Sequence, residues 1–221
     1  MKPPHGRPKE GLRLVALGGS AGGVAALGEI LPALPAEFPL PVVVLLHQPA
    51  ARSSLLAELF SRKCKLAVTE AYDKGTPEPG YIYFSPPDYH LMIERDFTFV
   101  LSVDPPVNFS RPSIDVLLES AAASVGESLL AIILTGTNTD GARGLRAVRE
   151  AGGLGWVQAP QEAQSSIMPR AAIEFAGADA ILRLAEIAEQ LSRLVTAGDL
   201  QPSGAVAASG GDRHLRDDDL R

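Results

Sequence analysis

Several stretches of the chain are continuously apolar and rich in β-branched residues, a pattern typical of strands buried on both faces of a sheet. They read "LRLVALGG" at 12–19, "LPVVVLLHQP" at 40–49, "SLLAIILTG" at 128–136 and "LGWVQA" at 154–159. Glycine or proline follows each run closely, which limits its length to that of a strand rather than a long helix. The pattern therefore predicts a buried strand at each of these four runs.

Between the predicted strands, apolar residues recur at helical spacing. The segment 24–34 is interrupted by Pro32 and Pro35, so its helix should stop there, and two serines can cap a short helix over 53–63. Further helices are predicted over 113–126, 140–152, 167–177 and 180–195. Because strands and helices alternate, the chain should form right-handed βαβ units.

Residues 66–103 have a different character. Short runs there ("LAVTEA", "GYIYFSPP", "YHLMIERD", "FTFVLSV") alternate apolar and polar residues between Gly, Pro and Asp. Such alternation predicts short, partly antiparallel strands or hairpins. The expected fold class is therefore α/β: a doubly wound, mainly parallel sheet with helices on both faces and a short antiparallel hairpin section.

Composition narrows the class further. The chain has 221 residues, 46% hydrophobic and 21% charged, which suits one soluble globular domain. Its net charge is −6, and the sequence contains no block of basic residues. Both observations argue against nucleic acid or an anionic membrane as partner. The single cysteine, Cys64, excludes an internal disulfide framework and a Cys-rich zinc site.

The two ends differ from the middle. The N-terminal "MKPPHGRPKEG" is polar and lacks the apolar core of a signal peptide, and no run is long enough for a membrane span. The tail from 196 is rich in Gly, Ser, Ala and Asp with few bulky apolar residues, so it cannot offset its ordering entropy. We expect disordered segments at 1–11 and 196–221, a folded catalytic domain at 12–195, and a cytoplasmic location without membrane insertion.

Three predicted strands end at chemically useful side chains. Ser20 follows the first, His47 the second, and Asp140 lies just beyond the strand at 128–136. Open parallel sheets bind ligands at the carboxyl ends of their strands, so a hydroxyl, an imidazole and a carboxylate should converge there. Each has an ordinary alternative: a structural turn at Ser20, a satisfied core or rim histidine at His47, and a helix N-cap at Asp140. Their convergence favours catalysis.

The glycine loop around Ser20 supports that interpretation. "GGSAGGVAAL" has no Lys followed by Ser or Thr, as a phosphate-binding loop requires, and no register of its glycines gives G-x-G-x-x-G. It does contain G-x-S-x-G as Gly18, Ser20 and Gly22, the pattern of a serine nucleophile on a tight, strained turn. The chain order Ser, His, Asp differs from that of ordinary α/β-hydrolases, chymotrypsin and subtilisin.

"ALGGSAGG", "VVVLLHQP", "YIYFSPPDYHL", "RPSIDVLLESAA", "IILTGTNTDGARGL" and "SIMPRAAI" together resemble the catalytic domain of CheB-type chemotaxis protein-glutamate methylesterases, over about residues 12–193. The resemblance implies hydrolysis of glutamate methyl esters on the cytoplasmic helices of chemoreceptors, with release of methanol, and deamidation of receptor glutamines. It implies Ser20 as nucleophile, His47 as general base and Asp140 as the carboxylate that orients it. It implies no metal and no cofactor.

Residues that contact the substrate are predicted next. The alkoxide formed by attack of Ser20 needs donors, which the backbone near Ala21 or the backbone N–H of Thr137 can supply. Arg111 is the candidate side chain for the substrate cleft, where it would pair with acidic residues on the receptor; its alternative is an ion pair with Asp115 one helical turn on.

The chain also departs from the family pattern. Thr137 and Asn138 stand where the family usually has Met-Gly, Ala21 where it often has Thr, and Gln48 where Met is usual. Family members usually carry an N-terminal receiver domain, and the polar residues at 1–11 contain none, so a separate receiver or sensor protein is an expected partner. The alternative function is a catalytically weak relative that binds a receptor or signalling partner through the same cleft.

Overall fold

We analysed a computed structural model of the chain, which describes residues 11–47 and 55–194. The segments predicted to be disordered, 1–11 (except Gly11) and 196–221, lie outside the described residues. So do Gln48 and the serines at 53 and 54.

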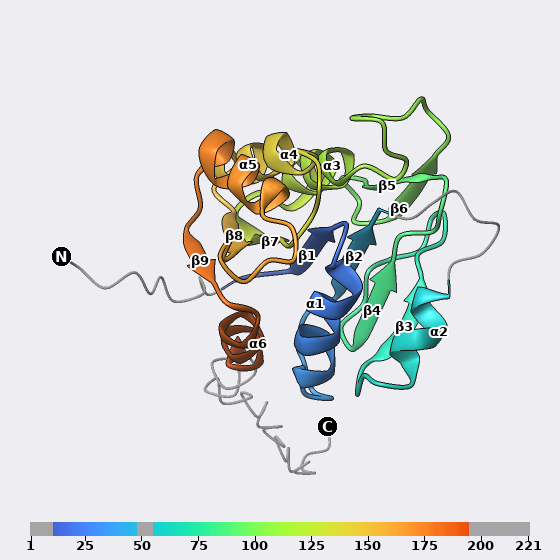
Figure 1. The fold of residues 1–221 in the computed structure, drawn as a ribbon. Coiled ribbons are helices and arrows are strands. Elements are labelled where there is room, and N and C mark those ends of the chain that lie inside the picture. Colours follow the sequence, from blue (N-terminus) through green and yellow to red (C-terminus); the bar gives the residue numbers. More distant parts are fainter. Residues whose placement is uncertain (1–10, 48–54, 195–221) are drawn as a thin grey trace, which may run out of the picture.

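A parallel sheet forms the centre of the fold (Figure 1). Its seven strands lie in the order β3-β4-β2-β1-β7-β8-β9, and every neighbouring pair is parallel. Their bounds are β1 Leu14–Gly19, β2 Val42–Leu46, β3 Ala67–Glu70, β4 Tyr81–Phe84, β7 Leu129–Ile133, β8 Leu154–Gln158 and β9 Ala180–Leu182. After β1 the chain places β2, β3 and β4 on one side, with β4 between β2 and β3, and then returns to place β7 on the other side of β1. The strand order therefore reverses at β1, where sheets of this kind bind their ligands.

Helices cover both faces of this sheet (Figure 1). Packed against one face are α1 Gly23–Ile30 and α6 Leu184–Ser192, with α2 Leu56–Ser61 near the β3 edge. The other face is covered by α3 Ile114–Val125, α4 Ala142–Glu150 and α5 Ile167–Ala176. Short 3₁₀ turns follow α1 (Leu31–Ala33) and α3 (Gly126–Ser128).

The continuous apolar runs feed two separate cores. Along β1, Val15 and Leu17 face the core beneath α1, whereas Leu14 and Ala16 face the core beneath α3. All are at most 1% exposed, so both faces of the strand are buried. This explains why the sequence shows an unbroken apolar run there rather than alternation.

The predicted fold class is confirmed, with two corrections of detail. The segments "LAVTEA" and "GYIYFSPP" form β3 and β4, which are parallel members of the main sheet; the antiparallel hairpin is β5 His90–Ile93 with β6 Phe99–Ser102. The segment 180–195 does not begin as a helix, because its first residues form β9, which pairs with β8 at the sheet edge. Within 11–47 and 55–194, no helix is long and apolar enough to cross a membrane.

Candidate active site

The turn after β1 is held between the ends of two neighbouring strands. The backbone N–H of Ser20 donates to the carbonyl of Thr135 beyond β7, at 2.9 Å. The backbone N–H of His47, just after β2, donates to the carbonyl of Gly19 at 3.1 Å. These bonds continue the parallel ladders for one more residue on each side. The sheet therefore brings Ser20 and His47 to adjoining strand ends, as the sequence predicts.

Glycine is required at two positions around Ser20. A Cβ on Gly18 would lie 2.5 Å from the side chain of Ile114, at the start of α3. Gly22 has φ of +83°, and a Cβ there would lie within 2.8 Å of two side-chain atoms of Gln164. The left-handed residue of the turn is thus Gly22, whereas Ser20 does not adopt positive φ. Glycine adopts this conformation without steric cost, so the tight turn is formed by the neighbours of Ser20.

His47 and Asp140 form a direct pair. The imidazole Nε2 lies 2.8 Å from Asp140 Oδ2, and the two side chains are 12% and 0% exposed. A carboxylate at this distance fixes the ring orientation and favours the tautomer with hydrogen on Nε2. Nδ1 is then the ring nitrogen left to act as a base, whereas the chymotrypsin-type triad uses Nε2.

Asp140 is buried, and both oxygens of its carboxylate accept hydrogen bonds. Besides His47, its carboxylate accepts hydrogen bonds from the Asn108 amide, the Ser113 hydroxyl and the backbone N–H groups at the start of α3, between 2.6 and 3.2 Å. Burial by itself would raise the pKa of Asp140, but the hydrogen bonds from His47, Asn108, Ile114 and Ser113 outweigh it and lower the pKa. Asp140 is therefore ionised at neutral pH, and its carboxylate accepts a hydrogen bond from the imidazole of His47.

Asp115 is a second buried carboxylate beside Asp140. Its Oδ1 accepts the backbone N–H groups of Gly141 and Gly144 at 2.9 and 2.7 Å, and its Oδ2 accepts the Asn108 amide at 2.8 Å. Burial raises the pKa of Asp115, and the charge of Asp140 adds to that rise.

Sequence reasoning missed the supporting residues Asn108, Ser113 and Asp115. The available signal was weak: Asn, Ser and Asp before and within the first turn of a predicted helix are ordinary capping residues. Only their convergence on Asp140 gives them a further role.

Ser20 and His47 are neighbours without a hydrogen bond between their side chains. Among the described residues, Ser20 Oγ has no hydrogen-bond partner, and the partner of His47 Nδ1 is the amide nitrogen of Asn138, at 3.4 Å. The triad assignment therefore stays a prediction.

Backbone donors are available near Ser20. The N–H groups of Ala21, Gly22 and Thr137 donate to no described residue, and the side chains of Ala21 and Thr137 are exposed. Thr135 stabilises this region, since its hydroxyl lies 2.9 Å from the Ala21 carbonyl and accepts the Ser165 N–H at 2.9 Å. The geometry leaves both predicted sources of an oxyanion donor open.

Arg111 binds other partners than those expected. Its guanidinium donates to Asp88 Oδ1 at 2.7 and 3.1 Å and to the carbonyls of Val103 and Asp104. The alternative ion pair with Asp115 is wrong, because Asp115 faces inward to cap α4. Arg111 holds three loop segments together, and its contact with substrate stays a prediction.

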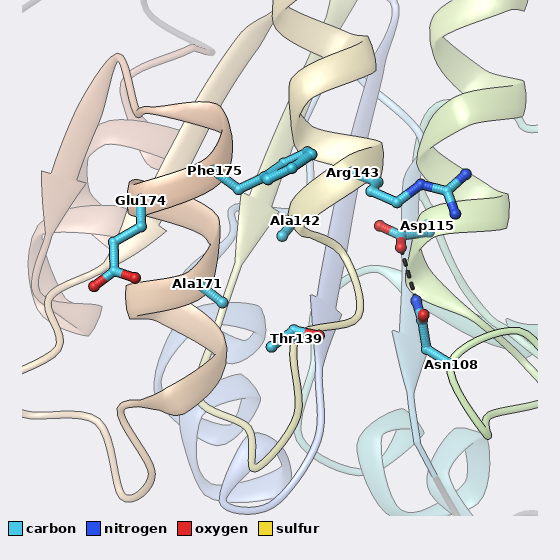
Figure 2. Close-up of a pocket in the computed structure, with 8 residues that line it drawn as sticks. All are labelled: Asn108, Asp115, Thr139, Ala142, Arg143, Ala171, Glu174 and Phe175. Atoms are coloured by element: carbon cyan, nitrogen blue, oxygen red, sulfur yellow. Dashed lines mark hydrogen bonds between the residues drawn. The ribbon is translucent and has the colours of Figure 1, made fainter.

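A pocket of about 470 Å³ lies next to Asp140, between α4 and α5 (Figure 2). Ala171 and Phe175 line it from α5, opposite Ala142 on α4, and Asn108 and Asp115 close the far side. Neither Ser20 nor His47 lines this pocket, so the pocket does not enclose the predicted nucleophile and base.

Cys64 is not activated for nucleophilic catalysis. Burial raises the pKa of the Cys64 thiol to about 11, so it is no nucleophile at neutral pH. In the described part of the chain, no three His, Cys, Asp or Glu side chains are grouped to hold a metal ion.

Together, the doubly wound sheet, the glycine turn and the His47–Asp140 pair define an α/β protein with a hydrolase-type site at the strand ends. The family model described as CheB methylesterase matches residues 15–191. The chain belongs to the CheB methylesterase family, and it is a methylesterase, that is, a carboxylic ester hydrolase.

Relatives with curated names agree. A putative protein-glutamate methylesterase/protein-glutamine glutaminase of Leptospira interrogans is 44% identical over 81% of this chain and 93% of its own length. The protein-glutamate methylesterase/protein-glutamine glutaminase of Salmonella typhimurium is 35% identical over 84% of this chain and 54% of its own. The chain thus spans nearly all of one relative and about half of the other.

A solved structure agrees as well. The crystal structure of the Thermotoga maritima CheB methylesterase catalytic domain superposes with a TM-score of 0.79 at 33% identity, over 83% of this chain and 98% of that one. The predicted family, fold and enzyme class are confirmed.

Proposed function

We propose that this methylesterase hydrolyses glutamate methyl esters on the cytoplasmic helices of chemoreceptors, with Ser20, His47 and Asp140 as its catalytic triad. The observation that carries the proposal is the 2.8 Å bond between His47 and a buried Asp140 whose pKa is lowered, beside the turn that presents Ser20. The names of the relatives supply the substrate class, protein glutamate methyl esters.

The chemistry follows from these positions. Ser20 Oγ attacks the ester carbonyl while its proton passes to His47 Nδ1, and the Asp140 carboxylate stabilises the imidazolium that forms. The backbone N–H groups of the Ser20 turn and of Thr137 donate hydrogen bonds to the oxyanion that forms. Collapse of the tetrahedral intermediate breaks the bond to methoxide, which takes the proton from His47 and leaves as methanol. Water then attacks the acyl-Ser20 with His47 again as base, releasing glutamate.

The same sequence of steps applies to an amide, with ammonia leaving in place of methanol. Deamidation of receptor glutamines is therefore a second proposed activity of the site, in keeping with the names of the relatives. A separate receiver or sensor protein as regulator, and the cytoplasmic location, stay predictions.

Methanol release from membranes containing methylated receptor tests the proposal. Ser20→Ala and His47→Ala should each lower the rate by about 10³-fold or more, because triad members act as a unit. Ser61→Ala is the control, since Ser61 is an exposed serine whose hydroxyl donates to the Glu58 carbonyl on α2. Equal rates for wild type and Ser20→Ala would overturn the nucleophile assignment.

The alternative, a catalytically weak relative that binds through the same cleft, has one observation in its favour: Ser20 Oγ bonds to no described residue. A phosphonate ester that labels activated serines separates the two functions. Labelling of wild type but not of Ser20→Ala supports the esterase; receptor binding without labelling or methanol release supports the binding protein.

A further inference from the structure

Asn138 makes two contacts that place its side chain against the catalytic base. Its Oδ1 accepts the backbone N–H of Asp140 at 3.2 Å, an Asx turn that connects the two residues locally. Its Nδ2 lies 3.4 Å from His47 Nδ1. A backbone N–H can only donate, so the first contact assigns the oxygen of the amide and leaves the NH₂ group to face the imidazole.

The orientation of Asn138 selects one state of His47. The amide NH₂ offers hydrogens and no acceptor, so it fits only an Nδ1 that carries a lone pair. On the opposite side of the ring, the Asp140 carboxylate fits only an Nε2 that carries hydrogen. Both neighbours therefore favour the same neutral tautomer, which is the one competent to accept a proton at Nδ1.

The lone pair that faces Asn138 is also the one that must take the proton of Ser20. Among the described residues, Ser20 Oγ donates to no acceptor, while the Asn138 amide lies at the lone pair. Two donors cannot both occupy one lone pair at full strength. The hydroxyl can be activated only when the amide withdraws.

We infer that Asn138 is a positioning residue that acts as a brake on the catalytic base: it holds His47 in the productive tautomer but must release Nδ1 before Ser20 can react. This inference rests on the proposed function, since it assumes that Ser20 is the nucleophile and His47 its base. It assigns a role to a residue outside the proposed triad. Asn138 is held in place by its hydrogen bond from the backbone N–H of Asp140.

Substitutions can separate the two contacts of Asn138. Asn138→Ser keeps a side-chain oxygen that accepts the Asp140 N–H, as serine does in equivalent turns, but is too short to reach His47. Asn138→Asp keeps the acceptor and replaces the donor with a carboxylate, which instead favours hydrogen on Nδ1. Thr139→Ser is the neighbouring control, because Thr139 is exposed and its backbone carbonyl, not its side chain, accepts the hydrogen bond from the Ala142 N–H.

The rate of phosphonate labelling of Ser20 is the primary measurement. The contact is long, so its removal in Asn138→Ser should speed labelling by about twofold to fivefold. Asn138→Asp should slow labelling by about tenfold or more, because Nδ1 then carries hydrogen and has no lone pair for the proton of Ser20. Thr139→Ser should match wild type, and the thermal midpoints of Asn138→Ser and wild type should agree.

The ¹⁵N resonance of His47 Nδ1 gives a second measurement that needs no catalysis. It should be that of an unprotonated nitrogen in wild type, should shift in Asn138→Ser, and should become that of a protonated nitrogen in Asn138→Asp. An unmoved resonance in Asn138→Ser would overturn the contact itself.

The outcomes distinguish this inference from the proposed function. If wild type labels at Ser20 and Asn138→Ser labels no faster, the brake is wrong while the esterase stands. If only Asn138→Ser labels, the brake is supported in its strongest form. If neither labels, the nucleophile assignment is wrong and the brake falls with it.

Discussion

Asp115 and Asp140 lie beside each other in the interior, and each carboxylate caps the helix that begins at the other. Asp140 accepts the N–H groups of Ile114 and Asp115 at the start of α3, while Asp115 accepts those of Gly141 and Gly144 at the start of α4. The Asn108 amide donates to both carboxylates, at 2.8 and 3.0 Å. The positive ends of two helices and one neutral amide thus compensate two adjacent buried acids. The carboxylate that pairs with His47 is therefore also part of the contact between α3 and α4.

Removing Asp115 should therefore cost stability. Asp115→Ala leaves the N–H groups of Gly141 and Gly144 without their acceptor inside the protein, and we expect a loss of about 2–3 kcal/mol in the free energy of unfolding. Glu119→Ala is the control: Glu119 is partly exposed on the same helix and pairs with Arg143 at the surface, so its loss should change stability by about 0.5 kcal/mol or less. Urea unfolding of both variants measures the difference. Equal midpoints would contradict the capping role.

Acid should destabilise the protein through Asp140. Its pKa is lowered in the folded state, so its contribution is present above the unfolded pKa of about 3.9 and is lost as pH falls through the folded value. The raised pKa of Asp115 acts in the opposite direction, since its ionisation costs stability as pH rises through the range between its unfolded and folded values.

Urea unfolding between about pH 2 and 7 tests these signs. Asp140→Asn should be less stable than wild type at neutral pH and should lose less stability on acidification. A variant whose acid dependence matches that of wild type would show that other carboxylates govern acid unfolding.

Gly22→Ala should be destabilising. The φ of +83° is unfavourable for alanine, and its Cβ would meet Gln164 within 2.8 Å, so we expect a loss of about 1–3 kcal/mol and slower turnover as the Ser20 turn shifts. Gly28→Ala is the matched control inside α1, where a Cβ meets nothing within 4 Å; it should stabilise by about 0.5–1 kcal/mol. Thermal melts and methanol release measure both. A Gly22→Ala variant as stable and active as wild type would show that the turn tolerates another conformation.

Thr137→Met should change turnover more than stability. The Thr137 side chain is exposed, so its replacement alters little packing, while its backbone N–H remains available to an oxyanion. In other enzymes, loss of one oxyanion donor lowers the rate by about 10²–10³-fold. That factor is the largest loss of turnover we expect if the substitution displaces the Thr137 N–H. Steady-state kinetics and unfolding midpoints should be compared. A shifted midpoint with unchanged turnover would identify Thr137 as a packing residue and place the oxyanion donors in the turn after Ser20.

Much of this protein could be predicted from local pattern. Runs such as Leu14–Gly19 and Leu129–Ile133 are apolar at every position because both sides of the strand are buried, and such runs indicate a parallel sheet covered by helices. The placement of Ser20, His47 and Asp140 just beyond strands also follows from order along the chain. Parallel strands end at one edge, so their following residues meet there.

Edge strands and individual contacts could not be predicted in this way. β9 is three residues long and acquires its conformation from pairing with β8, while its own residues fit the helical spacing of the segment that follows. Arg111 follows the same rule: proximity in sequence favoured Asp115, but the loops bring Asp88, 23 residues away, to its guanidinium.

The sequence by itself determined the fold class, the family and which strands end in reactive side chains, because these depend on periodicity and on chain order. Only the tertiary structure decided how those side chains are held: the two acids that cap each other's helices, the amide of Asn108 between them, and the imidazole nitrogen that faces Asn138. Such contacts join residues far apart in the chain, and their geometry depends on how α3 and α4 pack over the sheet. Local sequence patterns do not determine that packing. The distances between side chains at the site are therefore fixed only once the whole domain has folded.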